Sequence, residues 1–160
     1  DDLPKGIKES EDAMAETIEN NIRKIIVDEQ PVNPRYYEEM SELLDALIEE
    51  RRQRALEYQE YLKRVKALAT KVVRPEGVGT DRYPNSLDSP AKRNLFDMLD
   101  GNEALALRVD TAVRYTKKAG WVHNRFKRKE VENAIREELG GYHINLDELM
   151  AVVIEQNEYK

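Results

Sequence analysis

The chain has 160 residues and a net charge of −6, with 36% charged and 40% hydrophobic residues. This length is enough to bury a core as one domain, or as one domain with a helical extension. Cysteine is absent, which excludes disulfide bridges and thiolate chemistry, and two histidines alone do not suit a structural zinc site. No apolar run approaches the ~20 residues of a membrane-spanning helix, so we expect a cytoplasmic protein without membrane contact. Because the first residue is Asp1 rather than Met, we also expect a piece of a longer protein.

The charges are unevenly distributed along the chain. Residues 1–60 carry a net charge of −9, residues 61–129 one of +9, and residues 130–160 one of −6. A basic centre between acidic ends can bind a polyanion although the whole chain is acidic. Alternatively, the acidic and basic segments neutralise one another in the folded protein. The charge distribution by itself leaves both interpretations open.

Apolar residues at intervals of three and four predict a first helix over residues 11–29. Ser10 is a suitable N-cap for this helix. Pro31 lies just beyond its end, where a proline ring stops a helix. The apolar face of the predicted helix consists of Met14, Ile18, Ile22, Ile25 and Ile26.

A second helix has a clear start, since Asn33 is a good N-cap and Pro34 fits the first helical position. No Gly or Pro follows before Pro75, so we expect one continuous helix of about 39 residues, roughly 58 Å long. It should form an antiparallel hairpin with the first helix, which is too short to cover its C-terminal half. Its apolar stripe keeps a regular heptad spacing and contains Tyr37, Met40, Leu44, Leu47, Tyr58, Tyr61, Val65, Leu68 and Val72.

Two positions of this stripe carry Arg51 and Arg54 in place of apolar residues. Guanidinium groups do not fit a uniformly dry coiled coil. Either the two side chains extend past the partner helix into water, or the packing face changes there. We therefore treat Arg51 and Arg54 as candidates for docking a partner protein.

Residues 73–89 contain two Gly and two Pro and predict an irregular linker. This linker divides the chain into a long helical hairpin over residues 1–72 and a C-terminal helical lobe over residues 90–160.

Four shorter helices are predicted in the C-terminal lobe from cap residues and glycine stops. They begin after Ser89, after Asn102, at Lys127 and after Asn145. The helix from Lys127 should end at Leu139, before two glycines. The predicted fold class is all-α, a long helical hairpin followed by a compact bundle of about four shorter helices.

Signatures of catalysis are absent from the sequence. It contains no glycine-rich phosphate loop and no dinucleotide-binding fingerprint. Neither His123 nor His143 lies in a pattern typical of nucleophilic catalysis. Pairs of neighbouring carboxylates occur beside arginines on predicted helices, where surface ion pairs are the usual explanation. We therefore expect no catalytic residue, no metal and no cofactor in this chain.

The strongest functional signal is a basic segment. From Arg108 to Lys129 there are eight basic residues and one acidic residue, Asp110. Several of these cations lie at the start of a predicted helix, where they repel one another and oppose the helix dipole, and an anionic partner would relieve this. We therefore predict a surface that binds the phosphate backbone of duplex DNA weakly and without sequence preference. Its candidate residues are Arg114, Lys117, Lys118, Arg125, Lys127, Arg128 and Lys129.

Two aromatic residues, Trp121 and Phe126, lie among these cations. Either they stack on nucleic-acid bases, or they anchor the connecting segment in the core. We expect the second arrangement for both residues.

The order of several short segments resembles a known family. The segments are Asn94-Leu-Phe-Asp-Met-Leu99, Glu103-Ala-Leu-Ala-Leu107, Gly120-Trp121, Lys129-Glu-Val-Glu-Asn-Ala-Ile135 and Val152-Val-Ile-Glu-Gln-Asn-Glu-Tyr159. Together they are similar to the C-terminal helical domain of the restriction (R, motor) subunit of type I restriction–modification enzymes. The segment from Ile18 to Ile26 and the long helix from Asn33 match the helical region before that domain, so the resemblance covers nearly the whole chain.

The resemblance implies an assembly role. In that family the subunit joins a nuclease domain and an ATP-driven translocase to helical domains that attach it to the methyltransferase core. This chain would then dock to the methyltransferase and specificity subunits and touch duplex DNA. ATP and Mg belong to the motor and nuclease domains of such a subunit, so no cofactor and no catalytic residue is implied here.

A second hypothesis belongs to a different class of protein. The chain is then a purely structural helical interaction domain, and its basic surface meets an acidic protein in place of DNA.

Overall fold

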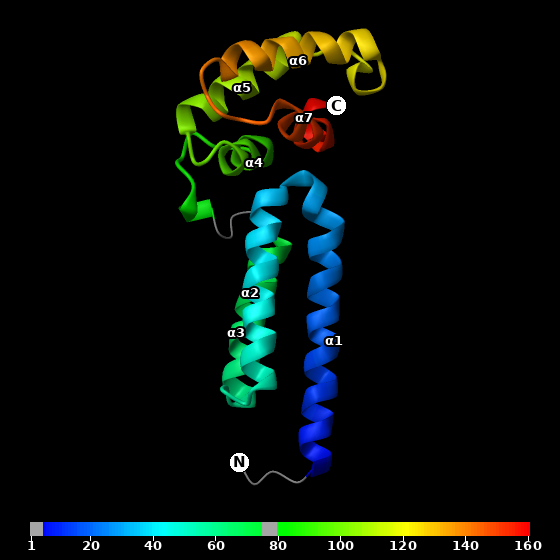
Figure 1. Cartoon of the computed structure of the whole chain (residues 1–160), viewed down its shortest axis with the longest axis vertical. Coiled ribbons are helices and arrows are strands. Elements are labelled where there is room, and N and C mark those ends of the chain that lie inside the picture. Colours follow the sequence, from blue (N-terminus) through cyan, green and yellow to red (C-terminus); the bar gives the residue numbers. More distant parts are fainter. Residues whose placement is uncertain (1–4, 75–79) are drawn as a thin grey trace. The chain divides into compact units, whose positions relative to one another are not determined.

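The computed structural model describes residues 5–74 and 80–160, which form seven α-helices and no strand (Figure 1). The all-α prediction is therefore confirmed. The chain divides into two compact units, one made of Asp1–Gln30 and Tyr37–Thr80, the other of Pro31–Tyr36 and Asp81–Lys160. Within the described residues, no helix is both long enough and apolar enough to cross a membrane.

The first unit has three helices in an up-down-up arrangement, in which the second runs antiparallel to the other two (Figure 1). They are α1 (Lys5–Glu29), α2 (Pro34–Arg52) and α3 (Tyr58–Val73). The helix α1 packs against α3, and Arg23 of α1 forms an ion pair with Asp45 of α2. The predicted N-cap at Ser10 is wrong, because α1 begins at Lys5 and Ser10 lies inside it; of residues 5–10 only Gly6 strongly disfavours a helix. The predicted apolar face of this helix is confirmed at Ile22 and Ile26 and wrong at Met14, which is 55% exposed.

The predicted single helix of about 39 residues is also wrong, because the chain turns between α2 and α3. The amide of Ala55 donates to the carbonyl of Glu50 over 2.9 Å, and the amide of Arg54 donates to Arg51 over 3.0 Å. These two bonds form a Schellman motif, and Arg54 occupies its left-handed position with φ of 57°. Glycine usually occupies that position, so a sequence without Gly or Pro gave no sign of the turn.

Two contacts offset the strain of a left-handed arginine. The Arg54 guanidinium holds both carboxylate oxygens of Asp12 on α1, over 2.8 and 2.7 Å. The turn also lets α3 fold back, so the two halves of the predicted stripe bury each other and α1. The predicted stripe is confirmed except at Tyr58, which is only partly buried at the start of α3. Its other members are buried: Tyr37, Met40, Leu44, Leu47, Tyr61, Val65, Leu68 and Val72.

The second unit contains the predicted bundle of four shorter helices. They are α4 (Pro90–Met98), α5 (Glu103–Thr116), α6 (Arg125–Leu139) and α7 (Leu146–Glu155). The predicted caps are confirmed, since the side chains of Ser89, Asn102 and Asn145 accept backbone N–H groups of the helices that follow. The predicted start of α6 at Lys127 is two residues late, because Asn124 caps this helix.

The predicted linker over residues 73–89 has two parts. Residues 75–79 lie outside the described residues. From Asp81 onward the segment belongs to the second unit, where Tyr83 and Leu87 are buried in the hydrophobic core. Tyr83 and Leu87, on either side of Pro84, thus pack as core.

The segment Pro31–Tyr36 belongs to the second unit although it joins α1 to α2. Asn33 is fully buried, and its side-chain oxygen accepts the amide of Tyr36, which confirms the predicted cap. Its side-chain amide donates to Asn94 and Asp97 of α4, over 3.0 and 2.9 Å. One cap residue therefore also fixes this segment to α4.

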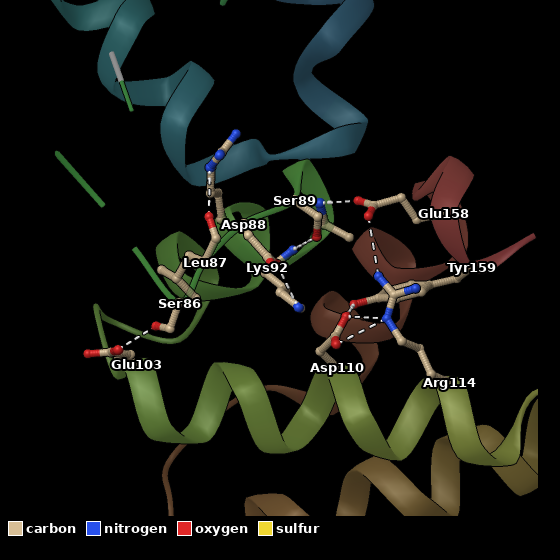
Figure 2. A network of polar contacts seen from close by, with 12 residues as sticks. Ser86, Leu87, Asp88, Ser89, Lys92, Glu103, Asp110, Arg114, Glu158 and Tyr159 are labelled. Carbon is tan, nitrogen blue, oxygen red and sulfur yellow. Dashed lines mark hydrogen bonds and ion pairs between the residues drawn. The ribbon is translucent and has the colours of Figure 1, made fainter. Parts of the chain in front are cut away.

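The last residues are fixed to the second unit by a polar network (Figure 2). The hydroxyl of Tyr159 donates to the buried Asp110 carboxylate over 2.6 Å, and the indole N–H of Trp121 donates to the Tyr159 carbonyl over 2.7 Å. Glu158 accepts the amide of Ala91 at the start of α4. The C-terminal segment thereby connects α4, α5 and the segment between α5 and α6.

Burial and the hydrogen bond to Asp110 raise the pKa of Tyr159 far above the usual 10.0. The folded state therefore favours the neutral phenol, and its stabilising contribution is complete below pH ~10 and lost as pH rises toward the folded pKa. We expect Tyr159→Phe to lower the free energy of unfolding by about 1 kcal/mol at neutral pH. The difference in the free energy of unfolding between this variant and the wild type should become smaller above pH ~10, as measured by urea unfolding at several pH values. If this difference in the free energy of unfolding stayed constant with pH, the predicted pH dependence would be contradicted.

Candidate nucleic-acid interface

The basic segment includes the last turn of α5, the first turn of α6 and the residues between them. An ion pair of 3.2 Å joins Arg108 to Glu138, and one of 2.8 Å joins Lys118 to Glu130. The early residue of one helix meets the late residue of the other, so the two helices run antiparallel. The end of α5 therefore lies beside the start of α6. We call this region, residues 114–129, the basic joint.

Local contacts allow cations to crowd the start of α6. The side-chain oxygen of Asn124 accepts the amides of Phe126 and Lys127, both over 3.0 Å, and so satisfies the first turn. The Lys127 ammonium donates to the carbonyl of Ala119 over 2.8 Å, and Arg128 donates to the carbonyl of Val122 over 3.1 Å. The carbonyl oxygens of the segment between the helices thus accept hydrogen bonds from two of these cations.

Three other predicted cations form ion pairs within the chain. Lys118 contacts Glu130, and Lys129 contacts Glu132 over 2.7 Å. The hydrogen bond from Lys129 lowers the pKa of Glu132. Arg114 holds the Asp110 carboxylate with its Nε atom, over 3.0 and 3.1 Å, and reaches Glu158 with another nitrogen (Figure 2). Arg114 therefore belongs to the C-terminal polar network.

Lys117 and Arg125 differ from the other five predicted cations. Among the residues that the structure describes, neither has an ion pair or a hydrogen bond from its side chain. Lys117 is half-buried and Arg125 is exposed at the first position of α6. Within the part of the chain that the structure describes, these are therefore the two positive charges of the basic joint that no internal partner occupies.

The two aromatic residues of the segment have different environments. Trp121 is 2% exposed and packs in the core, as predicted. Phe126 is 81% exposed, so the prediction that it anchors the core is wrong. Its position in the first turn of α6 lies on the side opposite the buried residues Val131 and Ile135. Sequence analysis also missed Tyr115 in the last turn of α5, which is 90% exposed.

The partner-docking candidates Arg51 and Arg54 lie in the first unit. The Arg51 side chain is 8% exposed and forms two hydrogen bonds with Glu19 of α1, over 2.7 and 2.9 Å. Tyr61 of α3 donates to the same carboxylate over 2.8 Å. Arg51 is thus occupied inside the unit, whereas the more exposed Arg54 holds Asp12. Docking through these residues stays a prediction.

The electrostatics of this network follow from its contacts. The hydrogen bond from Arg54 lowers the pKa of Asp12, and burial together with Glu19 raises the pKa of Tyr61. Beside the network is a cleft of about 410 Å³, lined in part by Lys8, Arg54 and Tyr58. Across residues 5–74 and 80–160, no three His, Cys, Asp or Glu side chains are grouped as they would be to hold a metal ion.

Comparison of the chain with protein-family models, with curated proteins and with solved structures gives no match. The likeness to the restriction subunit therefore rests on the sequence segments alone and stays a prediction.

Proposed function

We propose that this chain is a non-catalytic assembly module that contacts the phosphate backbone of duplex DNA through the basic joint and docks to a larger protein complex. The observation that carries the proposal is the pair Lys117 and Arg125, which lie among paired cations and lack an ionic partner within the described residues. Phosphates would supply the missing negative charge. The sequence likeness suggests the methyltransferase and specificity subunits of a type I restriction enzyme as the complex.

A second surface supports the docking role. Along α1, an apolar stripe continues beside the residues that pack on α3, with Ile7 47% and Met14 55% exposed. By helical spacing, Glu11, Asp28 and Glu29 flank this stripe, and no Lys or Arg does. The charge pattern fits a partner helix with an apolar face and basic flanks. The stripe consists of Ile7, Met14, Ile18 and Ile25.

The DNA contact predicts a salt-dependent affinity. With four to six phosphate contacts, the slope of log affinity against log salt would be about −4 to −5, with micromolar or weaker binding. The double variant Lys117→Glu/Arg125→Glu should weaken duplex binding and reduce the magnitude of this slope by about 2. Fluorescence anisotropy with labelled duplex at several salt concentrations measures both quantities.

The matched control reverses two exposed lysines of the first unit, Lys63→Glu/Lys66→Glu, which makes the same change in net charge. This control should retain most of the affinity if the basic joint is the binding surface. Lys127 and Arg128 are less suitable for reversal, because they also hold carbonyl oxygens between α5 and α6. Equal losses in both double variants would show a non-specific charge effect and contradict the proposal.

The alternative is a purely structural interaction domain without DNA contact. The ion pairs of Lys118 and Lys129 within the chain favour it, since they neutralise part of the basic joint. In that case duplex binding is absent even at low salt. Met14→Lys would still weaken capture of the methyltransferase core, while Val27→Lys, at an equally exposed apolar position off the stripe, would not.

A further inference from the structure

The two most exposed large apolar side chains of the described residues are both aromatic. Tyr115 is 90% and Phe126 is 81% exposed, whereas no other large apolar side chain exceeds the 60% of Val27. Most aromatic residues of this chain are buried, as Tyr61, Trp121 and Tyr159 are. Covering a solvent-exposed ring with another flat apolar surface lowers the free energy, because apolar area is removed from water. Tyr115 and Phe126 are therefore candidate contact sites for a binding partner.

Both rings belong to the basic joint. Tyr115 is in the last turn of α5 and Phe126 in the first turn of α6, and the ion pair between Lys118 and Glu130 brings these two helix ends together. Each ring projects from the side of its helix opposite the buried stripe. At about 100° per residue, Tyr115 lies roughly 200° round α5 from the buried Val113. Both rings thus lie on the outer side of the paired helices.

The cations near the rings decide which kind of partner fits. Lys117 is two positions after Tyr115, and Arg125 directly precedes Phe126. An apolar protein surface that covered the rings would also strip water from these cations, which is costly without a counter-charge. A nucleic-acid strand offers a flat base for each ring and a phosphate for each cation. Each ring of the basic joint has a cation within two positions in the sequence, as each base of a strand has a phosphate beside it.

Duplex DNA fits the rings poorly. Its bases are stacked on one another, so their faces are covered except at the ends of the helix. Unpaired bases expose both faces and stack on aromatic side chains with little regard to sequence. We infer that the basic joint binds single-stranded DNA in preference to duplex, with Tyr115 and Phe126 stacking on bases while Lys117 and Arg125 contact phosphates. This inference rests on the proposed contact of the basic joint with DNA phosphates.

The test compares two probes on the whole chain, a labelled oligothymidylate of about 20 nucleotides and a duplex of the same length. Wild type should bind the single strand more tightly. Tyr115→Ala and Phe126→Ala should each weaken single-strand binding about tenfold and change duplex binding less than about twofold. The conservative variants Tyr115→Phe and Phe126→Tyr should retain the affinity, because they keep the ring.

Two controls separate stacking from a general effect on the surface. Tyr142→Ala removes a half-exposed aromatic side chain outside the basic joint and should leave single-strand binding unchanged. Phe126→Trp places an indole at the proposed stacking position, and its emission should be quenched when the oligothymidylate binds. The buried Trp121 should contribute only a constant background to that signal.

The outcomes distinguish this inference from the proposed function. If the alanine variants bind the single strand as wild type does, while Lys117→Glu/Arg125→Glu still weakens duplex binding, the stacking inference is overturned and the phosphate contact stands. If the double charge reversal changes neither probe, the phosphate contact fails, and the inference that rests on it fails too. Tighter binding of duplex than of single strand by wild type would also overturn the inference.

Discussion

Replacing Glu19 by Leu is expected to lower the free energy of unfolding by about 3–5 kcal/mol. Glu19 is 4% exposed and accepts hydrogen bonds from Arg51 and from Tyr61. Leu fills a similar volume, so the main loss is the carboxylate. Among the described residues, Asp12 at 3.3 Å is then the one carboxylate left to balance the charge of the buried Arg51 guanidinium. Urea unfolding followed by circular dichroism measures the change.

Two further variants test the physical cause. The double variant Glu19→Leu/Arg51→Met removes both charges and should recover most of the lost stability, since apolar replacement of a buried ion pair is often neutral. Arg64→Ala breaks exposed ion pairs with Glu50 and Glu60 and should cost less than about 1 kcal/mol. If Glu19→Leu cost no more than Arg64→Ala, the buried network would not stabilise the first unit.

Replacing Trp121 by Ala is expected to destabilise the second unit by about 3–5 kcal/mol. The side chain is 2% exposed in the hydrophobic core, and its N–H holds the carbonyl of Tyr159 over 2.7 Å. Replacing the indole leaves a cavity and also removes one hydrogen bond to the C-terminal segment. The same urea experiment applies, with dichroism as the signal because Trp121 is the single tryptophan.

Trp121→Phe separates the two contributions, because it keeps most of the apolar volume and removes the N–H. We expect it to cost about 1–2 kcal/mol. Phe126→Ala removes an exposed ring five residues later and should change stability by less than about 0.5 kcal/mol. A Trp121→Ala protein as stable as Phe126→Ala would show that the indole does not hold the core together.

Local signals were sufficient to predict much of the fold. The caps at Asn33, Ser89, Asn102 and Asn145 were found from sequence because a capping side chain acts on backbone groups only two or three residues away. Most of the apolar stripe between residues 37 and 72 was found for a similar reason, since a helix of fixed pitch determines which residues share a face. Neither inference depends on distant parts of the chain.

The errors arose where distant contacts decide the outcome. The turn at Arg54 places a non-glycine residue in the left-handed region, with Asp12 of α1 bound to its side chain. No pattern near residue 54 shows that contact. A sign of the buried ion pair was present, however. Glu19 interrupts the apolar face of the first helix as Arg51 interrupts that of the second, and opposite charges on two packed stripes can pair.

The candidate interface was only partly predictable. The sequence showed where the cations lie, but two of their ionic partners are residues that only the folded chain brings near. These are Glu130 for Lys118 and Glu158 for Arg114. The exposure of the aromatic residues was harder to predict than the positions of the cations. Trp121 and Phe126 have similar neighbours in the sequence, yet the first is buried and the second is exposed. Asn124 was the missed signal, since its cap sets the start of α6 and so the direction of Phe126.

The place of Pro31–Tyr36 in the second unit has a consequence for the order of folding. During synthesis the residues of α1, α2 and α3 are complete long before α7 is made. The side chain of Asn33 can form its hydrogen bonds only after Asn94 and Asp97 have been made. The carbonyl of Val32 can form its bond only with the side chain of Gln156, 124 residues later. A nascent chain can thus hold a finished three-helix unit while its first interhelical turn still lacks its partners. That turn can therefore be completed only after Gln156 has left the ribosome.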